Sequence, residues 1–255
     1  MNDATARLPS TAMPEARRFH VDGRLVDEAE CRRLFAAVQL PDRMRRAAAL
    51  VEGETVADIG AYYGGFVDHL TSAGHRAIGI DYDPHNIEIA EMLFPELEFV
   101  ESSVYELALP DASVDCVTFQ EVIEHLEGPA QALKEINRIL RPGGVLIVTT
   151  PNAYYWRHFR DFAGAEAKDR LRRRPPTLAN AVFHAESEWN RHIHAWTPST
   201  LLTLVEGNGF RYVSHEFALD AVSGLERALL QVAPFTGPVI VLKVRKTAEA
   251  PARLV

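Results

Sequence analysis

Hydrophobic and polar positions alternate in blocks from about residue 53 onward. Apolar, β-prone runs recur along the chain, and the segments between them carry apolar residues at helical spacing. The predicted strands cover residues 55–60, 76–81, 97–102, 114–120 and 145–150, and the predicted helices between them cover 66–73, 84–93 and 129–140. Because such alternation builds a parallel sheet with helices on both faces, the predicted fold class is three-layer α/β.

The pattern breaks after this fifth strand and resumes near residue 198. Residues 154–190 contain several arginines and a Pro-Pro pair, and they are too many for an ordinary connection. We interpret them as a lid-like insertion over a substrate. The later elements are predicted helices over 198–206 and 223–230 and predicted strands over 210–217 and 238–244. The last strand follows a hairpin-like approach, so we expect it to run antiparallel in an otherwise mostly parallel sheet.

The two ends of the chain lack the alternating strand and helix pattern of the centre. Residues 1–18 are polar and proline-containing, which predicts a flexible tail. Residues 19–52 are predicted to form N-terminal helices, over 27–39 and 42–51, separated by Pro41. The main domain is expected over 53–246, with a second tail over 247–255.

Charge and cysteine usage narrow the function classes. The formal net charge of −8 makes nucleic acid an unexpected partner, because phosphate binding normally needs a basic footprint. Cys31 and Cys116 lie far apart, which argues against a disulfide framework and a cysteine zinc site. No apolar run approaches the roughly 18 residues of a membrane span, and the N-terminus lacks a signal-peptide core. We therefore expect a cytoplasmic enzyme without a membrane partner.

A glycine-bearing loop follows the first predicted strand and carries the first candidate chemistry. It starts at Asp58-Ile-Gly60, and a turn of this kind lets backbone approach a ligand closely. Tyr62 stands where the dinucleotide fingerprint needs its second glycine, so NAD binding loses its main support. Asp81 ends the second strand, 21 positions after Gly60, where a carboxylate can accept both ribose hydroxyls. Together these residues predict an adenosine-type site at the carboxyl edge of the sheet.

Further motifs follow the adenosine-type site in a fixed order along the chain. The whole series comprises residues 56–66, Asp81, 107–115, 121–126, 140–144 and 150–152. Over about residues 50–215 the series resembles class I, Rossmann-like, S-adenosylmethionine-dependent methyltransferases. The resemblance implies that S-adenosyl-L-methionine is the cofactor. It also implies that Asp58 and Gly60 line the methionine part and that Asp81 binds the ribose.

The same resemblance assigns the remaining cofactor contacts. Tyr82 is expected to pack on adenine, and Ser103 with Val104 to meet the adenine edge. The further cofactor-binding candidates are Ala61, Tyr62, Gly64 and Gln120. Two positions depart from the family pattern: Tyr62 replaces the usual middle glycine, and Ser103 stands where aspartate is frequent. Tyr62 either reshapes the loop or covers the methionine end, and the contact to the adenine amino group stays open.

A Glu121-x-x-Glu124-His125 stretch follows the fourth predicted strand. A helical turn would place these side chains on one face, where two carboxylates repel unless a cation joins them. A divalent Mg, Mn or Zn would satisfy this set, with His192 or His194 completing it. The alternative is an acid–imidazole pair that merely orders a loop.

This stretch resembles metal-dependent O-methyltransferases, including small-RNA 2′-O-methyltransferases and ubiquinone-biosynthesis O-methyltransferases. Alignment on Trp196-Thr197 makes His192 the better metal ligand. It leaves His194 as a substrate-side base or a lid residue.

The predicted function is S-adenosylmethionine-dependent O-methylation of a small-molecule hydroxyl on a sugar, glycoside or phenolic metabolite. The catalytic candidates are His125, His194 and Glu121, acting as a proton acceptor or through a metal that lowers the pKa of the hydroxyl. Three alternatives are kept: a metal-independent N-methyltransferase of a metabolite amine, an RNA 2′-O-methyltransferase, and a non-catalytic cofactor-binding subunit. The expected partner is the hydroxyl acceptor, and a homodimer is left open.

Overall fold

The computed structural model describes residues 17–21, 23–36, 39–158, 160, 171, 192–220 and 222–247. The chain divides into two compact units, Met1–Gln39 and Leu40–Val255. In the first unit β1 (Arg18–Val21) and β2 (Arg24–Asp27) form an antiparallel hairpin, followed by α1 (Glu28–Ala36). The prediction of helices alone over 19–52 is therefore wrong at its start. Gly23, with φ of 75°, supplies the turn conformation that the hairpin needs.

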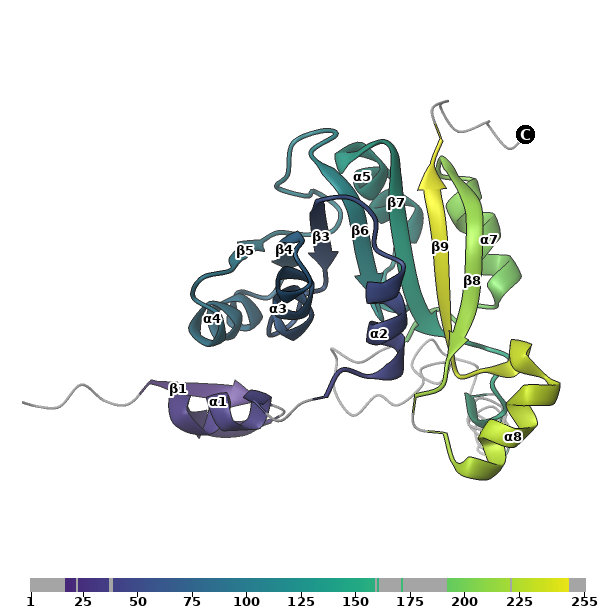
Figure 1. Ribbon diagram of the computed structural model, residues 1–255, viewed down its shortest axis with the longest axis horizontal. Helices are drawn as coiled ribbons and strands as arrows, with labels where there is room; N and C mark the ends of the chain where they lie inside the picture. The colour runs from purple at the N-terminus through teal and green to yellow at the C-terminus, as the bar shows by residue number, and fades with distance from the viewer. Residues whose placement is uncertain are drawn as a thin grey trace, which may run out of the picture. The chain divides into compact units, whose positions relative to one another are not determined.

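The second unit is built on a seven-stranded sheet (Figure 1). Its strands are β3 (Thr55–Ile59), β4 (Arg76–Asp81), β5 (Glu98–Glu101), β6 (Val114–Gln120), β7 (Leu140–Pro151), β8 (Phe210–Ala218) and β9 (Val239–Lys246), in the order β5-β4-β3-β6-β7-β9-β8. Strands β3 to β7 pair in parallel, and β9 runs antiparallel to β7 and β8. The predicted α/β fold with an antiparallel last strand is confirmed.

Helices cover both faces of this sheet. The helices of this unit are α2 (Asp42–Ala49), α3 (Gly65–Ser72), α4 (Pro84–Leu93), α5 (Pro129–Ile139), α7 (Pro198–Glu206) and α8 (Gly224–Val232), with short 3-10 turns η1 (Ile123–His125) and η3 (Pro234–Thr236). Helix α8 packs against η3. Helices α5 and α7 pack against one face with Phe119 of β6, and α2 and α3 pack against the other with Cys116. Because successive residues of β6 enter opposite clusters, the central strands are buried on both sides.

The carboxyl ends of β3, β4 and β6 meet at one edge of the sheet, and the loops that leave them carry the predicted site residues. The predicted lid over 154–190 and the predicted tails over 1–18 and 247–255 lie largely outside the described residues. Within the described part of the chain, no helix is long and apolar enough to cross a membrane.

Candidate functional site

The loop after β3 folds back onto the neighbouring strand β4. The backbone N–H groups of Gly60 and Ala61 donate to the carbonyl of Ile80 at 2.8 and 3.0 Å. Tyr62 has φ of 52°, the left-handed region that glycine adopts most readily, and its side chain is 48% exposed. Tyr62 thus adopts a backbone conformation that favours glycine. Its own N–H donates to Asp81 Oδ2 at 2.9 Å.

Two buried carboxylates lie at the ends of adjacent strands. Asp58 on β3 is 3% exposed and accepts a 2.7 Å hydrogen bond from the Thr118 hydroxyl. Burial raises the pKa of Asp58 to about 6, although hydrogen bonds from Thr118 and Gln120 lower it in part. Asp81 on β4 is 6% exposed, and burial likewise raises its pKa. Gln120 adds a buried Oε1 that has no hydrogen-bond partner among the described residues.

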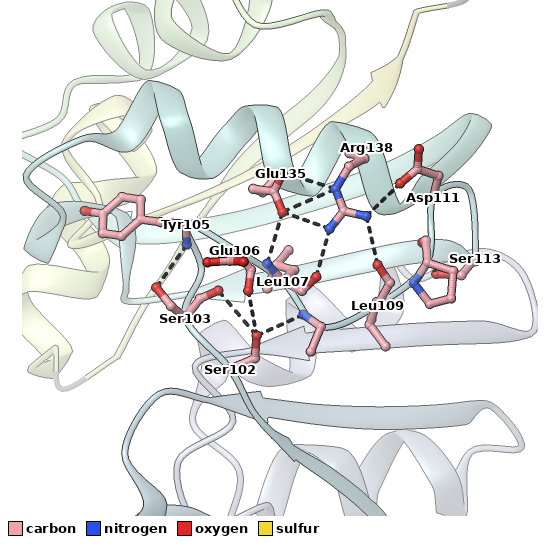
Figure 2. Close-up of polar contacts among 12 residues, drawn as sticks. Ser102, Ser103, Tyr105, Glu106, Leu107, Leu109, Asp111, Ser113, Glu135 and Arg138 are labelled. Atoms are coloured by element: carbon pink, nitrogen blue, oxygen red, sulfur yellow. Dashed lines mark hydrogen bonds and ion pairs between the residues drawn. The ribbon is translucent and has the colours of Figure 1, made fainter.

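The predicted adenine contacts lie on two more exposed segments. Tyr82, just after β4, is 58% exposed and therefore presents its ring to the surface. Ser103 accepts the backbone N–H of Tyr105 through its hydroxyl at 3.2 Å, and Val104 packs against the main hydrophobic cluster. Beside them, the Ser102 hydroxyl donates to the Glu106 carbonyl at 2.9 Å (Figure 2).

An arginine on α5 holds the continuation of this loop, as Figure 2 shows. Arg138 donates to the carbonyls of Leu107 and Leu109, each at 2.8 Å, and pairs with Asp111 at 2.7 Å and with Glu135 at 2.8 Å. The Glu135 carboxylate in turn accepts the Leu107 N–H at 3.0 Å. Sequence reasoning missed this cluster, because its only signal is the acid–arginine spacing of three on a predicted helix.

The acid–histidine stretch begins with a strained residue directly after β6. Glu121 has φ of 53°, and its backbone N–H and its Oε1 both bind Thr149, at 2.9 and 3.1 Å. Glu124 follows in η1, is 1% exposed, and accepts the Thr150 hydroxyl through Oε2 at 3.0 Å. Its Oε1 is buried without a hydrogen-bond partner in the described chain. Burial raises the pKa of Glu124, and the Glu121 charge raises it further.

A distant segment docks onto this turn and brings in the second histidine. The N–H groups of Ile193 and His194 donate to the carbonyl of Glu124 at 2.8 and 3.1 Å. This contact places the ring of His192 edge-on to His125, with centroids 4.7 Å apart. Glu124, His125 and His192 then offer ligand atoms that all lie within 4.8 Å of one another.

Only some of the predicted metal and catalytic residues lie together in the structure. Three of the four predicted metal ligands come together, whereas Glu121 is not part of that group and binds Thr149 instead. His194 contacts the carbonyl of Leu126 through Nε2 at 2.9 Å. Because a carbonyl only accepts, this nitrogen carries the proton and is not available as a base.

Aromatic residues at the start of the predicted lid are tied to α8. The Tyr155 hydroxyl and Trp156 Nε1 donate to Glu226 at 3.0 and 3.1 Å, and Arg157 pairs with it at 2.6 Å. Hydrogen bonds from Ser223, with those from this cluster, lower the pKa of Glu226 to about 2. No motif in the sequence singles out Glu226, so sequence reasoning missed the acceptor that orders this end of the predicted lid.

Similarity to known proteins covers the strand edge and the loops that leave it. A family model described as a methyltransferase domain matches residues 32–215. A probable S-adenosylmethionine-dependent methyltransferase of Mycolicibacterium smegmatis is 38% identical over 117 residues, which cover 46% of this chain and 46% of that protein. A ubiquinone biosynthesis O-methyltransferase of Paracidovorax citrulli is 31% identical over 110 residues, 41% of this chain and 46% of that protein. The chain thus spans about half the length of these curated relatives.

Solved structures share the fold at low identity. A methyltransferase from Thermotoga maritima, described as a possible histamine N-methyltransferase, superposes with a TM-score of 0.58 at 17% identity, over 86% of this chain and 92% of that one. At this identity the likeness supports the fold, including its mostly parallel sheet.

Proposed function

The chain belongs to the methyltransferase-domain family, and from this premise we propose that it transfers the methyl group of S-adenosylmethionine to a hydroxyl of a small molecule. The observation that favours a hydroxyl is the group of Glu124, His125 and His192. An alcohol must lose a proton to become a good nucleophile, and an acid–histidine group at the strand edge meets that need. The relative from Paracidovorax citrulli, an O-methyltransferase by name, supports the same acceptor chemistry.

The residues at the carboxyl edge fit the cofactor. S-Adenosylmethionine brings a cationic ammonium, a sulfonium and two ribose hydroxyls, all of which seek acceptor oxygens. The site offers the buried carboxylates of Asp58 and Asp81 and the buried Oε1 of Gln120, which lacks a partner among the described residues. Asp81 would hold the ribose, and Asp58 with Gln120 the methionine end. Because the cofactor arrives with positive charge, it offsets the cost of ionising the buried Asp58.

A divalent cation fits the second group of residues. Glu124 Oε1 is a buried oxygen without a hydrogen-bond partner in the described chain, 3.9 Å from His125 Nε2, and His125 and His192 add two imidazoles. One carboxylate and two imidazoles suit Mn or Zn, and Mg less well. When bound, the cation would lower the pKa of the acceptor hydroxyl. Thr150, by holding Oε2, leaves Oε1 as the ligand atom.

The position of the acceptor completes this proposal. Transfer of a methyl group needs the acceptor oxygen aligned behind it, so holding the two reactants in place contributes much of the barrier reduction. Glu121 is held by Thr149 and acts on the cluster electrostatically, since its charge raises the pKa of Glu124. This charge opposes the ionisation of Glu124, and a bound cation would offset it.

The test uses the full chain with isotopically labelled S-adenosylmethionine and a panel of phenols, sugars and amines. We expect hydroxyl compounds to be methylated, the activity to fall on chelation, and Mn²⁺ or Zn²⁺ to restore it. Calorimetric titration with Mn²⁺ should show binding that is lost in Glu124→Gln and kept in the matched control Glu127→Gln, whose side chain is exposed.

Transfer to amines that resists chelation and tolerates Glu124→Gln would establish the N-methyltransferase alternative instead. Tight RNA binding with a steep dependence on salt would favour RNA 2′-O-methylation. Binding of the cofactor without turnover on any acceptor would point to a regulatory subunit.

A further inference from the structure

A guanidinium with an unpartnered buried nitrogen lies in the first turn of α2. Arg43 donates through Nη1 to Asp220 Oδ2 at 3.1 Å. Its Nε is buried and has no hydrogen-bond partner among the described residues. Leaving a buried donor of a charged group unpaired costs free energy. The Arg43 side chain as a whole is 26% exposed, so a molecule bound beside it could supply the missing partner of Nε.

Strand pairing places this guanidinium over the same edge of the sheet as the acid–histidine group. Helix α2 contacts β7, β8 and β9 (Figure 1), and Arg46, one turn after Arg43, pairs with Glu216 of β8. Glu216 and Thr149 of β7 have the same partner residue on β9. The Thr149 hydroxyl also binds Glu121. The N-terminal turn of α2 thus lies over the strand ends next to Glu121.

Asp220 fixes the direction from which Arg43 approaches. Asp220 follows β8. The last residue of β8, Ala218, and the last residue of β7, Pro151, both pair with Val239 of β9, so the two strands end at the same level of the sheet. Asp220 also accepts the backbone N–H of Asp42 at 2.6 Å, which ties the start of α2 to the carboxyl edge.

We propose that Arg43 binds an anionic group of the methyl acceptor, a carboxylate or a phosphate, while Asp220 orients the guanidinium. A guanidinium recognises such groups through two parallel N–H donors, and the contact to Asp220 through Nη1 leaves the Nε edge for this purpose. The acceptor class is then a hydroxyl compound that also carries an acidic group, such as a phenolic acid, a uronic acid or a sugar phosphate. This inference rests on the proposed methyl transfer to a hydroxyl.

The test measures binding, so that it does not depend on turnover. The full chain, saturated with S-adenosylhomocysteine, is titrated calorimetrically with 3,4-dihydroxybenzoate against 3,4-dihydroxybenzamide. Glucuronate and glucose 6-phosphate are titrated against glucose, and these two arms separate carboxylate from phosphate. We expect at least one anionic probe to bind more tightly than its neutral partner. Arg43→Gln should weaken that probe about ten- to a hundredfold, and Arg43→Lys should restore only part of the loss.

Arg45→Gln is the matched control, because Arg45 lies on the same helix, is 58% exposed, and pairs with Asp42 and the Leu40 carbonyl. It should bind the probes as the unchanged chain does. Thermal unfolding of each variant shows whether Arg43→Gln merely loosens α2. Equal affinity for charged and neutral probes, equal effects of Arg43→Gln and Arg45→Gln, or no binding of any anionic probe would each overturn the inference. Anion binding without methylation of any hydroxyl would overturn the proposed function but leave the Arg43 site standing.

Discussion

The backbone N–H of Tyr62 donates a 2.9 Å hydrogen bond to the carboxylate of Asp81. This contact ties the loop after β3 to the end of β4, so the two segments expected to hold the cofactor are positioned by each other. It also explains how tyrosine is tolerated at a position whose positive φ glycine adopts most readily. The backbone adopts the left-handed conformation, a carboxylate accepts its N–H, and the ring remains half exposed.

The first prediction concerns Asp81 itself. Its two oxygens accept three donors, from Tyr62, Asp83 and Asn86, and would also accept the ribose hydroxyls. Asp81→Asn replaces one acceptor oxygen with a donor, so we expect the affinity for S-adenosylhomocysteine to fall about ten- to a hundredfold by calorimetry. Asp83→Asn is the control: Asp83 caps α4 by accepting the His85 N–H, and asparagine caps equally well. Equal losses in both variants would contradict the assignment.

The second prediction is a pH dependence set by Asp58. Its pKa in the folded chain is about 6, above the ordinary 3.8. The unfolded chain therefore releases this proton first, and the folded chain without cofactor loses stability from Asp58 as the pH rises from about 4 to about 6. The loss is about 3 kcal/mol, from a shift of roughly two pKa units. Urea unfolding across this range should show a weaker decline in Asp58→Asn.

The same proton links the pH to cofactor binding. The cationic end of S-adenosylmethionine favours the ionised form of Asp58, so the affinity should rise with pH and level off above about 6. Calorimetry in buffers of different ionisation enthalpy measures the proton released on binding. Release of the same number of protons by Asp58→Asn would assign the linkage to another group.

The third prediction concerns the arginine that holds the loop after β5. Arg138→Leu leaves the carbonyls of Leu107 and Leu109 without their donor and Glu135 without its cation (Figure 2). We expect the free energy of unfolding to fall by about 1–3 kcal/mol. The affinity for S-adenosylhomocysteine should fall as well, because Ser103 and Val104 begin the same loop. Lys134→Gln, an exposed change on α5, should alter neither quantity. Unchanged affinity in Arg138→Leu would separate this loop from the adenine site.

Local patterns were enough to predict the sheet and the position of Asp58 and Asp81 at one edge of it. Apolar runs fix the strands that bury both faces, such as β6 with Phe119 and Cys116 in opposite clusters. Asp58 and Asp81 could be predicted because parallel neighbouring strands end at the same edge, whatever the rest of the chain does.

Local patterns alone did not bring distant segments together. His192 was placed beside Glu124 and His125 by the family resemblance, and in the structure the backbone of Ile193 and His194 holds it there by docking on the Glu124 carbonyl, a hydrogen bond that no periodicity encodes. The helical turn expected after β6 would have put the side chains of Glu121 and Glu124 on the same face of that turn. Instead Glu121 adopts a positive φ and binds Thr149 of the neighbouring strand. Arg43 likewise acquires its place from the packing of α2 over β7 and β9.

The last prediction contrasts two adjacent glycines at the start of α3. Gly64 has φ of 81°, and a Cβ added there would lie 2.5 Å from the Phe99 ring of β5. Gly64→Ala combines about 1–2 kcal/mol of left-handed backbone strain with about 1–3 kcal/mol of overpacking. Gly65 is in the helix, has an ordinary φ, and a Cβ there meets open space. Gly65→Ala should therefore leave the free energy of unfolding unchanged or raise it by up to about 1 kcal/mol. Urea unfolding of the two variants gives the comparison, and Gly64→Ala/Phe99→Leu should recover part of the loss if the ring is the obstacle. Similar stabilities for the two alanine variants would show that the loop relaxes around the new methyl group, and that the turn between β3 and α3 is less rigid than its hydrogen bonds to β4 imply.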